Sequence, residues 1–373
     1  MSVAMRMETA EASAFERIIG APPIPYAISA ALFATLFGPP TTIALGLLAT
    51  GSWAATVDLY FGGLPPDTLW QQVVAVLVWW LTYFVIFAAV RWERRAIARQ
   101  EVDLDPIRPP GYKSHSITQS MVAFWPAAIT GGALVAVSWP FVGAVVQGLG
   151  DAQAPLLKTV WIAQNLARLG LFFLGLGTLL WSSAAVLLGL IELGRRPLQL
   201  RPLEDDGLLG LRPAGSMALI VASTYFGIAS LLALQLALAP SIAAFSTTLA
   251  VSLVIGVLLF FAPLWKIHRK MLAAKKRRQT DVRSRLLHLA FESKRQVEPA
   301  YGTDSPSSAG ELADLRDSLG RAAEVLAIEA AGRKIDGAST WPLDLDILRR
   351  LGAVMLPIVI ALLTELVGRI LGL

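Results

Sequence analysis

The chain has 373 residues, of which 55% are hydrophobic and only 16% are charged, and its formal net charge is +5. This composition, with a mean hydropathy of +0.59, excludes a set of ordinary soluble domains. The chain has no cysteine, so disulfides and thiolate metal sites are excluded as well. These features predict an all-α, polytopic integral membrane protein.

Uncharged stretches give the expected order of the transmembrane helices. Each is long enough, or nearly long enough, for a helix of about 20 residues that crosses a bilayer. They cover residues 25–57, 68–90, 116–150, 169–191, 215–265 and 351–364. The stretch 215–265 is too long for one span, and Ala239 and Pro240 near its middle indicate a turn between two helices. We therefore expect about seven transmembrane helices.

Two consecutive prolines interrupt the first expected span. Pro39 and Pro40 follow Gly38 near its centre, where each removes a backbone donor and restricts the residue before it. Broken helices at membrane depth often line a cavity, because lipid cannot satisfy the freed carbonyl groups. The alternative interpretation is a proline kink that packs against a neighbouring helix.

The fourth span and the loop after it raise two further expectations. Residues 155–168 are expected to form an amphipathic helix on the outer surface, before the span begins near Leu169. After this span, the adjacent acids Glu204, Asp205 and Asp206 match the oxygen ligands that Mg²⁺ prefers, and such an ion would hold a phosphate. The alternative is that the neighbouring arginines neutralise these acids in a structured loop.

The sixth span is expected to continue into the cytoplasm as a helical stalk, because no obvious helix breaker follows it. A flexible turn at 298–310, rich in Pro, Gly and Ser, separates the stalk from a second helix. That helix carries a heptad-like apolar seam at Leu312, Leu315, Leu319, Ala322 and Leu326. The two helices are expected to pair as an antiparallel, coiled-coil-like hairpin, or to offer the seam to a neighbouring subunit or a soluble protein.

The chain then divides into four parts. These are a cytoplasmic segment 1–24, a six-span membrane domain 25–265, a cytoplasmic hairpin 266–345 and a C-terminal transmembrane helix 346–373. With the N-terminus in the cytoplasm, 29 of the 32 Lys and Arg residues lie on the cytoplasmic side, as the positive-inside rule describes. We expect a bacterial inner-membrane protein whose C-terminus lies on the outer side.

The most basic run follows Trp265 and has a use at the membrane. It is expected to lie against the anionic lipid of the inner leaflet, where each charge contributes about 1 kcal/mol. The run has no aromatic stacking residues after Trp265, so we do not expect it to bind nucleic acid.

Ionisable residues are scarce within the expected spans. Spans one to six are expected to contain none between their interfacial ends, whereas the seventh carries Glu365 and Arg369 on one helix face. A charge inside a membrane is costly and is often functional. A pair near the end of a span is also able to reach water and satisfy itself. We therefore expect no bound cofactor or metal and no enzymatic chemistry inside the bilayer.

Two functions fit these observations. The first is an ion channel or passive conduit, in which Thr247 and Thr248 line the pore of a homo-oligomer and the hairpin moves the gate. The second is a non-conducting scaffold or sensor that recruits a soluble protein through the hairpin. An interfacial enzyme that uses the acids at 204–206 is a minor third alternative.

Overall fold

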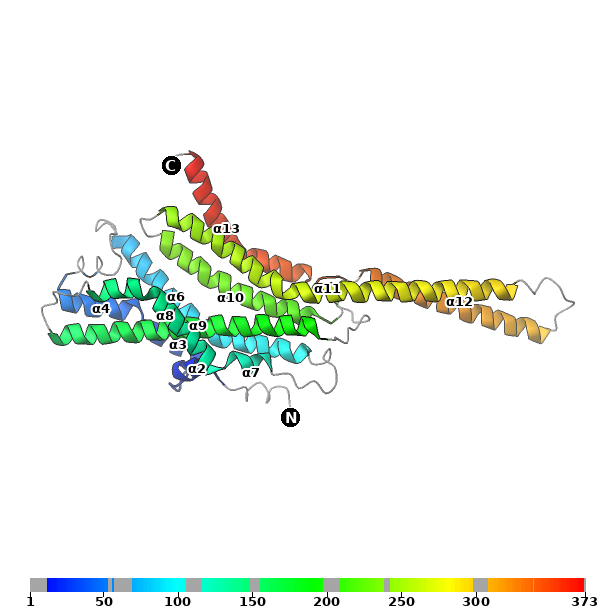
Figure 1. Cartoon of the computed structure of the whole chain (residues 1–373), viewed down its shortest axis with the longest axis horizontal. Coiled ribbons are helices and arrows are strands. Elements are labelled where there is room, and N and C mark those ends of the chain that lie inside the picture. Colours follow the sequence, from blue (N-terminus) through cyan, green and yellow to red (C-terminus); the bar gives the residue numbers. More distant parts are fainter. Residues whose placement is uncertain are drawn as a thin grey trace.

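The computed structural model is built from helices, and the residues that it describes form no strand (Figure 1). The described residues are 12–52, 56, 69–104, 116–147, 155–196, 208, 210–237, 242–297, 308–337 and 339–371. Within them, six helices are long and apolar enough to cross a membrane, by length and composition. The expected all-α, polytopic membrane class is confirmed, and the predicted count of about seven spans is close to this number.

The first span consists of two helices, α3 (Tyr26–Leu36) and α4 (Pro39–Thr50). Gly38 has an extended backbone and caps α4, whose first two positions are the prolines. Proline is favoured there because the first turn of a helix has no use for the missing N–H group. A Cβ atom on Gly38 would lie 1.9 Å from the carbonyl oxygen of Ala34. The close approach at the break therefore requires glycine.

The bundle is formed by α6 (Leu69–Leu104), α9 (Pro155–Arg195), α10 (Arg212–Ala237) and the first part of α11 (Ile242–Val297), which run side by side (Figure 1). The helices α8 (Phe124–Gln147) and α7 (Ile117–Met121) pack on α9. The stretch Phe124–Val137 of α8 is an apolar helix too short to be counted among the six. It corresponds to the third expected span.

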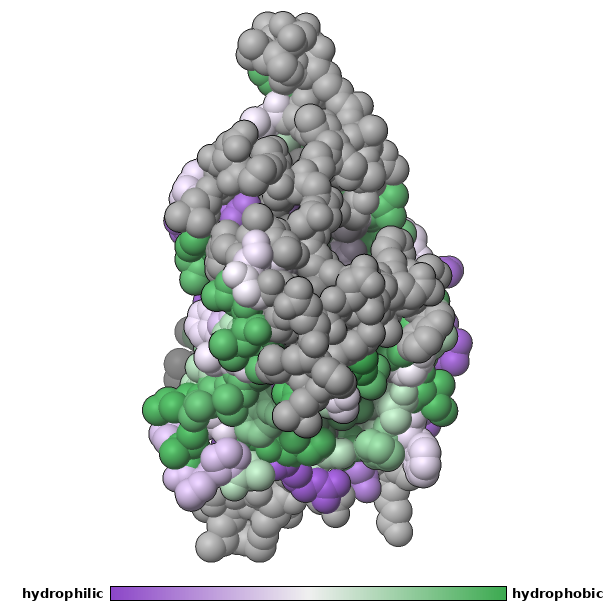
Figure 2. Space-filling model, turned by 90° about the vertical axis from the view of Figure 1, so that its left-hand side faces the viewer, coloured by the Kyte–Doolittle hydropathy of each residue, from purple (hydrophilic) through white to green (hydrophobic). Residues whose placement is uncertain are grey.

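Large apolar side chains also cover the outside of the bundle. Leu77 of α6, Ile129 of α8 and Val254 of α11 are 57%, 68% and 58% exposed. Figure 2 looks onto the end of the bundle opposite the hairpin and shows hydrophobic residues along the flanks of the described part. Exposed apolar surface of this extent fits contact with lipid.

Beyond the bundle, α11 continues without interruption and pairs with the antiparallel α12 (Ser308–Gly337) in a projecting hairpin (Figure 1). Residues 298–307 of the turn expected at 298–310 lie outside the described residues. Its last three residues, 308–310, are helical and belong to α12, so the turn ends earlier than expected. After the hairpin, α13 (Leu345–Leu371) returns toward the bundle, and its second half diverges from the other helices in Figure 1. The long stalk expected from the sixth span is therefore present.

One expectation about a helix boundary differs from the structure. Residues 155–168 are not a separate surface helix, because α9 is continuous over 41 residues; no proline or other breaker separates this segment from the span. The described part of the predicted N-terminal segment 1–24 contains one helix, which packs on the bundle. The short helix α2 (Ala14–Ile19) packs on α6 and α9, and its Phe15 and Ile19 are buried.

The apolar seam of α12 also differs from its expected position. Leu319 and Leu326 are 63% and 64% exposed, so these two side chains do not lie between the paired helices. Gly332 faces Val282 of α11, and Gln279 of α11 donates a hydrogen bond to the Asp336 carboxylate. The side chains of Leu312 and Leu315 lie outside the described residues.

Candidate functional site

A buried carboxyl group lies where α6 meets α9 and α10. Glu93 is on α6, three residues past the uncharged stretch that ends at Val90, and its side chain is fully buried. It contacts Ser182 and Ser183 of α9. Ser183 is nine residues from Glu192 along α9, which corresponds to about 14 Å of helix. The carboxyl group is therefore surrounded by an uncharged part of the neighbouring helix.

Only one oxygen of this carboxyl group is satisfied within the described part of the chain. Ser182 and Ser183 donate hydrogen bonds to Oε1 of Glu93 at 3.0 and 3.3 Å. The Thr224 side chain lies beside the carboxyl group, but its hydroxyl donates to the carbonyl oxygen of Ile220 at 3.1 Å. Oε2 is buried and accepts no hydrogen bond from a described residue. An unsatisfied buried polar atom costs about 1–3 kcal/mol, so a functional explanation is warranted.

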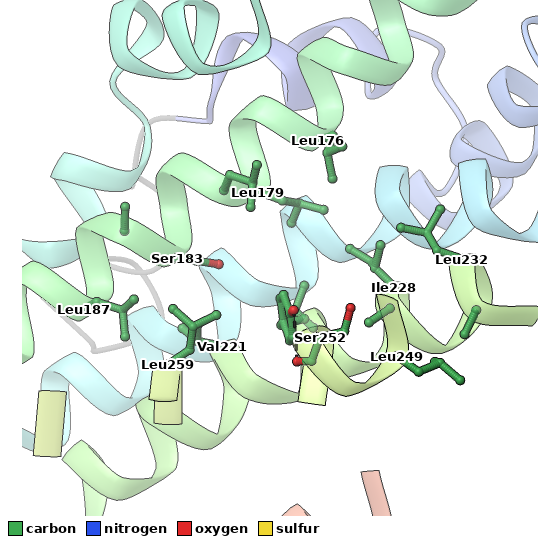
Figure 3. A pocket seen from close by; sticks show the side chains of 16 residues that line it. Leu176, Leu179, Ser183, Leu187, Val221, Ile228, Leu232, Leu249, Ser252 and Leu259 are labelled. Atoms are coloured by element: carbon green, nitrogen blue, oxygen red, sulfur yellow. Dashed lines mark hydrogen bonds between the residues drawn. The ribbon is translucent and has the colours of Figure 1, made fainter. Parts of the chain in front are cut away.

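A pocket of about 340 Å³ adjoins this group and is enclosed by α9, α10 and α11 (Figure 3). Most of its wall consists of Leu, Ala, Val and Ile side chains. Its hydroxyl-bearing residues are Ser183, Thr224, Tyr225 and Ser252. Ser183 therefore both lines the pocket and donates to Glu93. This serine connects the apolar pocket to the buried carboxyl group.

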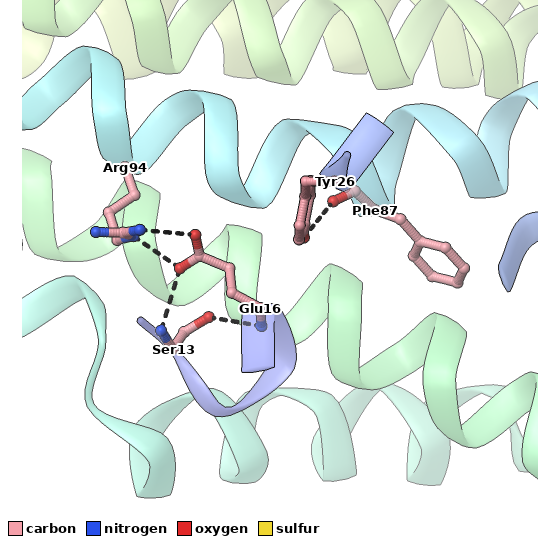
Figure 4. A network of polar contacts seen from close by, with 5 residues as sticks. All are labelled: Ser13, Glu16, Tyr26, Phe87 and Arg94. Carbon is pink, nitrogen blue, oxygen red and sulfur yellow. Dashed lines mark hydrogen bonds and ion pairs between the residues drawn. The ribbon is translucent and has the colours of Figure 1, made fainter. Parts of the chain in front are cut away.

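The neighbouring Arg94 belongs to a different polar network, on the α2 side of α6 (Figure 4). Its Nε and Nη2 atoms donate to the Oε2 and Oε1 atoms of Glu16 at 2.7 and 3.0 Å. Glu16 and Ser13 also form a capping box at the start of α2. Close by, the Tyr26 hydroxyl donates to the carbonyl oxygen of Phe87 at 3.0 Å. Glu16 thus already pairs the arginine next to Glu93, and the network fixes α2 and α3 on α6.

A second buried acid on α6, Glu101, has a structural role. It accepts hydrogen bonds from the backbone N–H groups of Ile117 and Thr118 at 2.8 and 3.0 Å. It also accepts from the hydroxyl groups of Ser116 and Thr118 at 2.9 and 2.6 Å. Donors at the start of a helix are otherwise unsatisfied, so this carboxylate holds the N-terminus of α7 against α6.

The proline break predicted at Pro39 and Pro40 is satisfied by protein groups. Thr41 donates its hydroxyl to the carbonyl oxygen of Thr35 at 2.6 Å. Gln164 of α9 donates its side-chain amide to the carbonyl oxygen of Leu36 at 2.5 Å. These bonds agree with the interpretation of a packed kink, and the pocket between α9, α10 and α11 includes no residue of α3 or α4.

The other residues singled out from the sequence are not brought to Glu93 by the described structure. Thr247 and Thr248 lie in the first turns of α11, and Glu365 and Arg369 lie in the last turns of α13. The side chains of these four residues are outside the described part of the structure. Glu204, Asp205 and Asp206 lie entirely outside the described residues.

The expectation of no ionisable group between the interfacial ends of spans one to six did not extend to Glu93, which lies three residues past the second expected span and is buried among helices of the bundle. The sequence does contain a signal for this residue. Buried positions on α6 follow a spacing of three or four residues, and Glu93 belongs to this stripe. Its described members are Tyr83, Ile86, Val90, Glu93, Ile97, Glu101 and Leu104. A three-four periodicity that continues past the uncharged stretch indicates a buried face.

The chain was compared with known protein families, curated sequences and solved structures. No protein-family model, curated protein sequence or solved structure matches the chain significantly. Function is therefore argued from the geometry of the chain itself.

Proposed function

We propose that the chain is a non-conducting membrane scaffold that assembles through the hairpin of α11 and α12. One observation supports this most: the hairpin exposes large apolar side chains where it projects beyond the bundle. The exposed fractions of Leu319 and Leu326 on α12 are 63% and 64%, and that of Phe291 on α11 is 71%. Burial of one such side chain contributes about 1.5–3 kcal/mol. A protein partner that covers this surface is therefore favoured.

The base of the hairpin is attached to the bundle, which gives the hairpin a defined direction. The ring of His268 on α11 stacks on that of Trp341, with centroids 4.1 Å apart. Arg212 at the start of α10 forms an ion pair with Asp344 at 3.0 Å, just before α13. Both chain segments that leave the hairpin are thus held at the same end of the bundle. The hairpin is a directed extension of the membrane domain.

A second copy of the chain is the partner that these features favour. Hairpins anchored in one membrane stand at the same height, so Leu319 and Leu326 of one copy lie level with those of another. Charge supports the pairing: residues 266–297 contain eleven basic and two acidic residues, whereas α12 contains four basic and six acidic residues. Contact between α11 of one copy and α12 of the next therefore brings together opposite charges. The competing arrangement is a soluble protein bound to the same face.

Energy transfer between labelled copies tests this proposal. Because the chain has no cysteine, a single Ser284→Cys substitution at an exposed stalk position provides a unique label. Full-length protein with donor or acceptor dyes is reconstituted into liposomes at a low protein-to-lipid ratio. We expect transfer well above the random level, and we expect Leu326→Glu to reduce it severalfold because a charge would then be buried at the contact.

The matched control is Ala327→Glu. Ala327 is exposed and points about 100° away from Leu326 around the helix, so this variant adds the same charge outside the apolar face. Equal loss in the two variants would argue against a contact through that face. Transfer at the random level in the parent protein would refute self-assembly and would favour recruitment of a soluble protein.

A conduit gated by the hairpin is the second candidate function. It is favoured by the continuity of α11, which runs from a pocket-lining position at Ser252 into the hairpin without a break. In this arrangement a movement of the hairpin reaches the membrane half of the same helix. Ion flux through the full-length protein in liposomes should then change with both Leu326→Glu and the pair Thr247→Val and Thr248→Val. Absence of flux across several ions and voltages would exclude a conduit.

A further inference from the structure

We propose that the pocket between α9, α10 and α11 binds an uncharged, membrane-soluble molecule with an apolar chain and one hydroxyl group. This inference goes beyond the scaffold function and does not depend on it. It rests on three features of the pocket: its volume and lining, its opening toward the outside of the bundle, and the direction in which its hydroxyl groups donate.

The volume and lining fit a small apolar chain. Ligand sites usually enclose about 300–1,000 Å³ and are mostly apolar with a few polar groups, and this pocket has a volume of about 340 Å³. At a share of about 30 Å³ for a group of the size of water, it holds on the order of ten non-hydrogen atoms. An alcohol with a chain of about ten carbons has this size.

The pocket reaches the lipid-facing surface of the bundle. Leu180 of α9 and Leu232 of α10 both line it and are 40% and 37% exposed. A ligand that is dissolved in the bilayer therefore enters between these two helices without crossing water. This route selects for apolar molecules, because a charged group in the hydrocarbon region is costly.

Three of the four hydroxyl groups at the wall of the pocket use their hydrogen atoms on protein acceptors. Ser183 donates to Glu93 at 3.3 Å, and Thr224 donates to the carbonyl oxygen of Ile220 at 3.1 Å. Tyr225 donates to the carbonyl oxygen of Ser252 at 3.1 Å. A hydroxyl has one hydrogen and two lone pairs, so these three groups offer acceptors to a ligand. The pocket thus favours a ligand that donates a hydrogen bond over one that only accepts.

Glu93 acts as a positioning residue for this recognition. It does not line the pocket, but its Oε1 atom accepts from Ser183, which does. The carboxyl group therefore holds the Ser183 hydroxyl with its lone pairs available. Since none of the described residues that line the pocket is a carboxylate, a cationic amine would enter without a contacting counter-charge from them. The preferred donor is a neutral hydroxyl group.

Photolabelling of the full-length protein in liposomes tests this proposal. The probe is 1-decanol that carries a photoreactive diazirine at the end of its chain, and the competitors are 1-decanol, decane, 1-methoxynonane and decylamine. We expect labelled peptides from α9 and α10, and competition by 1-decanol at a mole fraction about three- to tenfold below that of the other three compounds.

Three variants separate recognition from general partition into the membrane. Ser183→Ala should remove the preference for 1-decanol over 1-methoxynonane. Ser182→Ala should keep it, since Ser182 also donates to Glu93 but does not line the pocket. Ala229→Phe should fill the pocket and abolish competitive labelling. Equal competition by 1-decanol and decane, stronger competition by decylamine, or unchanged labelling of Ala229→Phe would each overturn the proposal.

Discussion

The buried ion pair between Arg94 and Glu16 provides a quantitative test of how the N-terminal helix is held. The pair is bidentate, with distances of 2.7 and 3.0 Å, and the side chains of Arg94 and Glu16 are 10% and 3% exposed. Loss of one partner of such a pair costs about 3–5 kcal/mol, because the other charge stays buried without compensation. We expect Arg94→Met to lower the free energy of unfolding by this amount.

The assay is unfolding of the purified protein by SDS in mixed micelles, followed by circular dichroism. Arg95→Met is the matched control, since Arg95 is the next residue and is exposed; its effect should stay within about 0.5 kcal/mol. The double variant Glu16→Gln with Arg94→Met should recover part of the loss, because it removes the uncompensated charge. A loss below about 1 kcal/mol in Arg94→Met, or no recovery in the double variant, would refute this account.

Three further predictions concern packing and caps. A Cβ atom on Gly177 would lie 2.5 Å from the backbone nitrogen of Gly131, whereas one on Gly170 would meet no described atom within 4 Å. Gly177→Leu should therefore separate α8 from α9 and lower the SDS midpoint, and Gly170→Leu should not. Glu101→Ala leaves the start of α7 without its acceptor and should cost at least about 2 kcal/mol, visible as faster amide exchange in α7. Trp341→Ala removes the stacked ring at the hairpin base and should raise amide exchange there about two- to tenfold, with exchange at the hairpin tip as the internal reference.

The sequence was sufficient to predict the membrane class, the break in the first span and the continuation of the sixth span beyond the bundle. Long uncharged stretches can cross a bilayer only as helices with satisfied backbones, and this constraint gave the spans. The consecutive prolines predicted an interruption in the first span, and α3 ends three residues before Pro39. The absence of a breaker after the sixth span predicted the stalk, and α11 is continuous over 56 residues.

The burial of Glu93 was not predicted. The uncharged stretch of α6 ends at Val90, but the buried face of this helix continues past that residue. Charge counts locate the boundary with lipid or water, whereas the burial of Glu93 depends on how α9 and α10 pack against α6. The burial of α2 likewise depends on Arg94, which is 78 residues away from Glu16 in the sequence. Contacts between such distant positions have no local pattern in one sequence.

The hairpin shows a related limit. The heptad spacing of Leu319 and Leu326 correctly indicates one apolar face on α12, but periodicity does not specify what the face contacts. In the structure that face is exposed, and α12 meets α11 through other positions such as Gly332.

The continuity of α11 has a mechanical consequence. The helix is held near His268, where the Trp341 ring stacks on it, and it extends in both directions from this point. Ser252 at the pocket lies about 24 Å from this fulcrum, and Val297 at the far end of the helix lies about 44 Å from it. Pro263 lies in the shorter arm, between the pocket and His268, and a proline inside a helix favours a kink. The two arms accordingly run in different directions in Figure 1, so a change of the kink angle would turn the longer arm, and with it the hairpin, relative to the bundle.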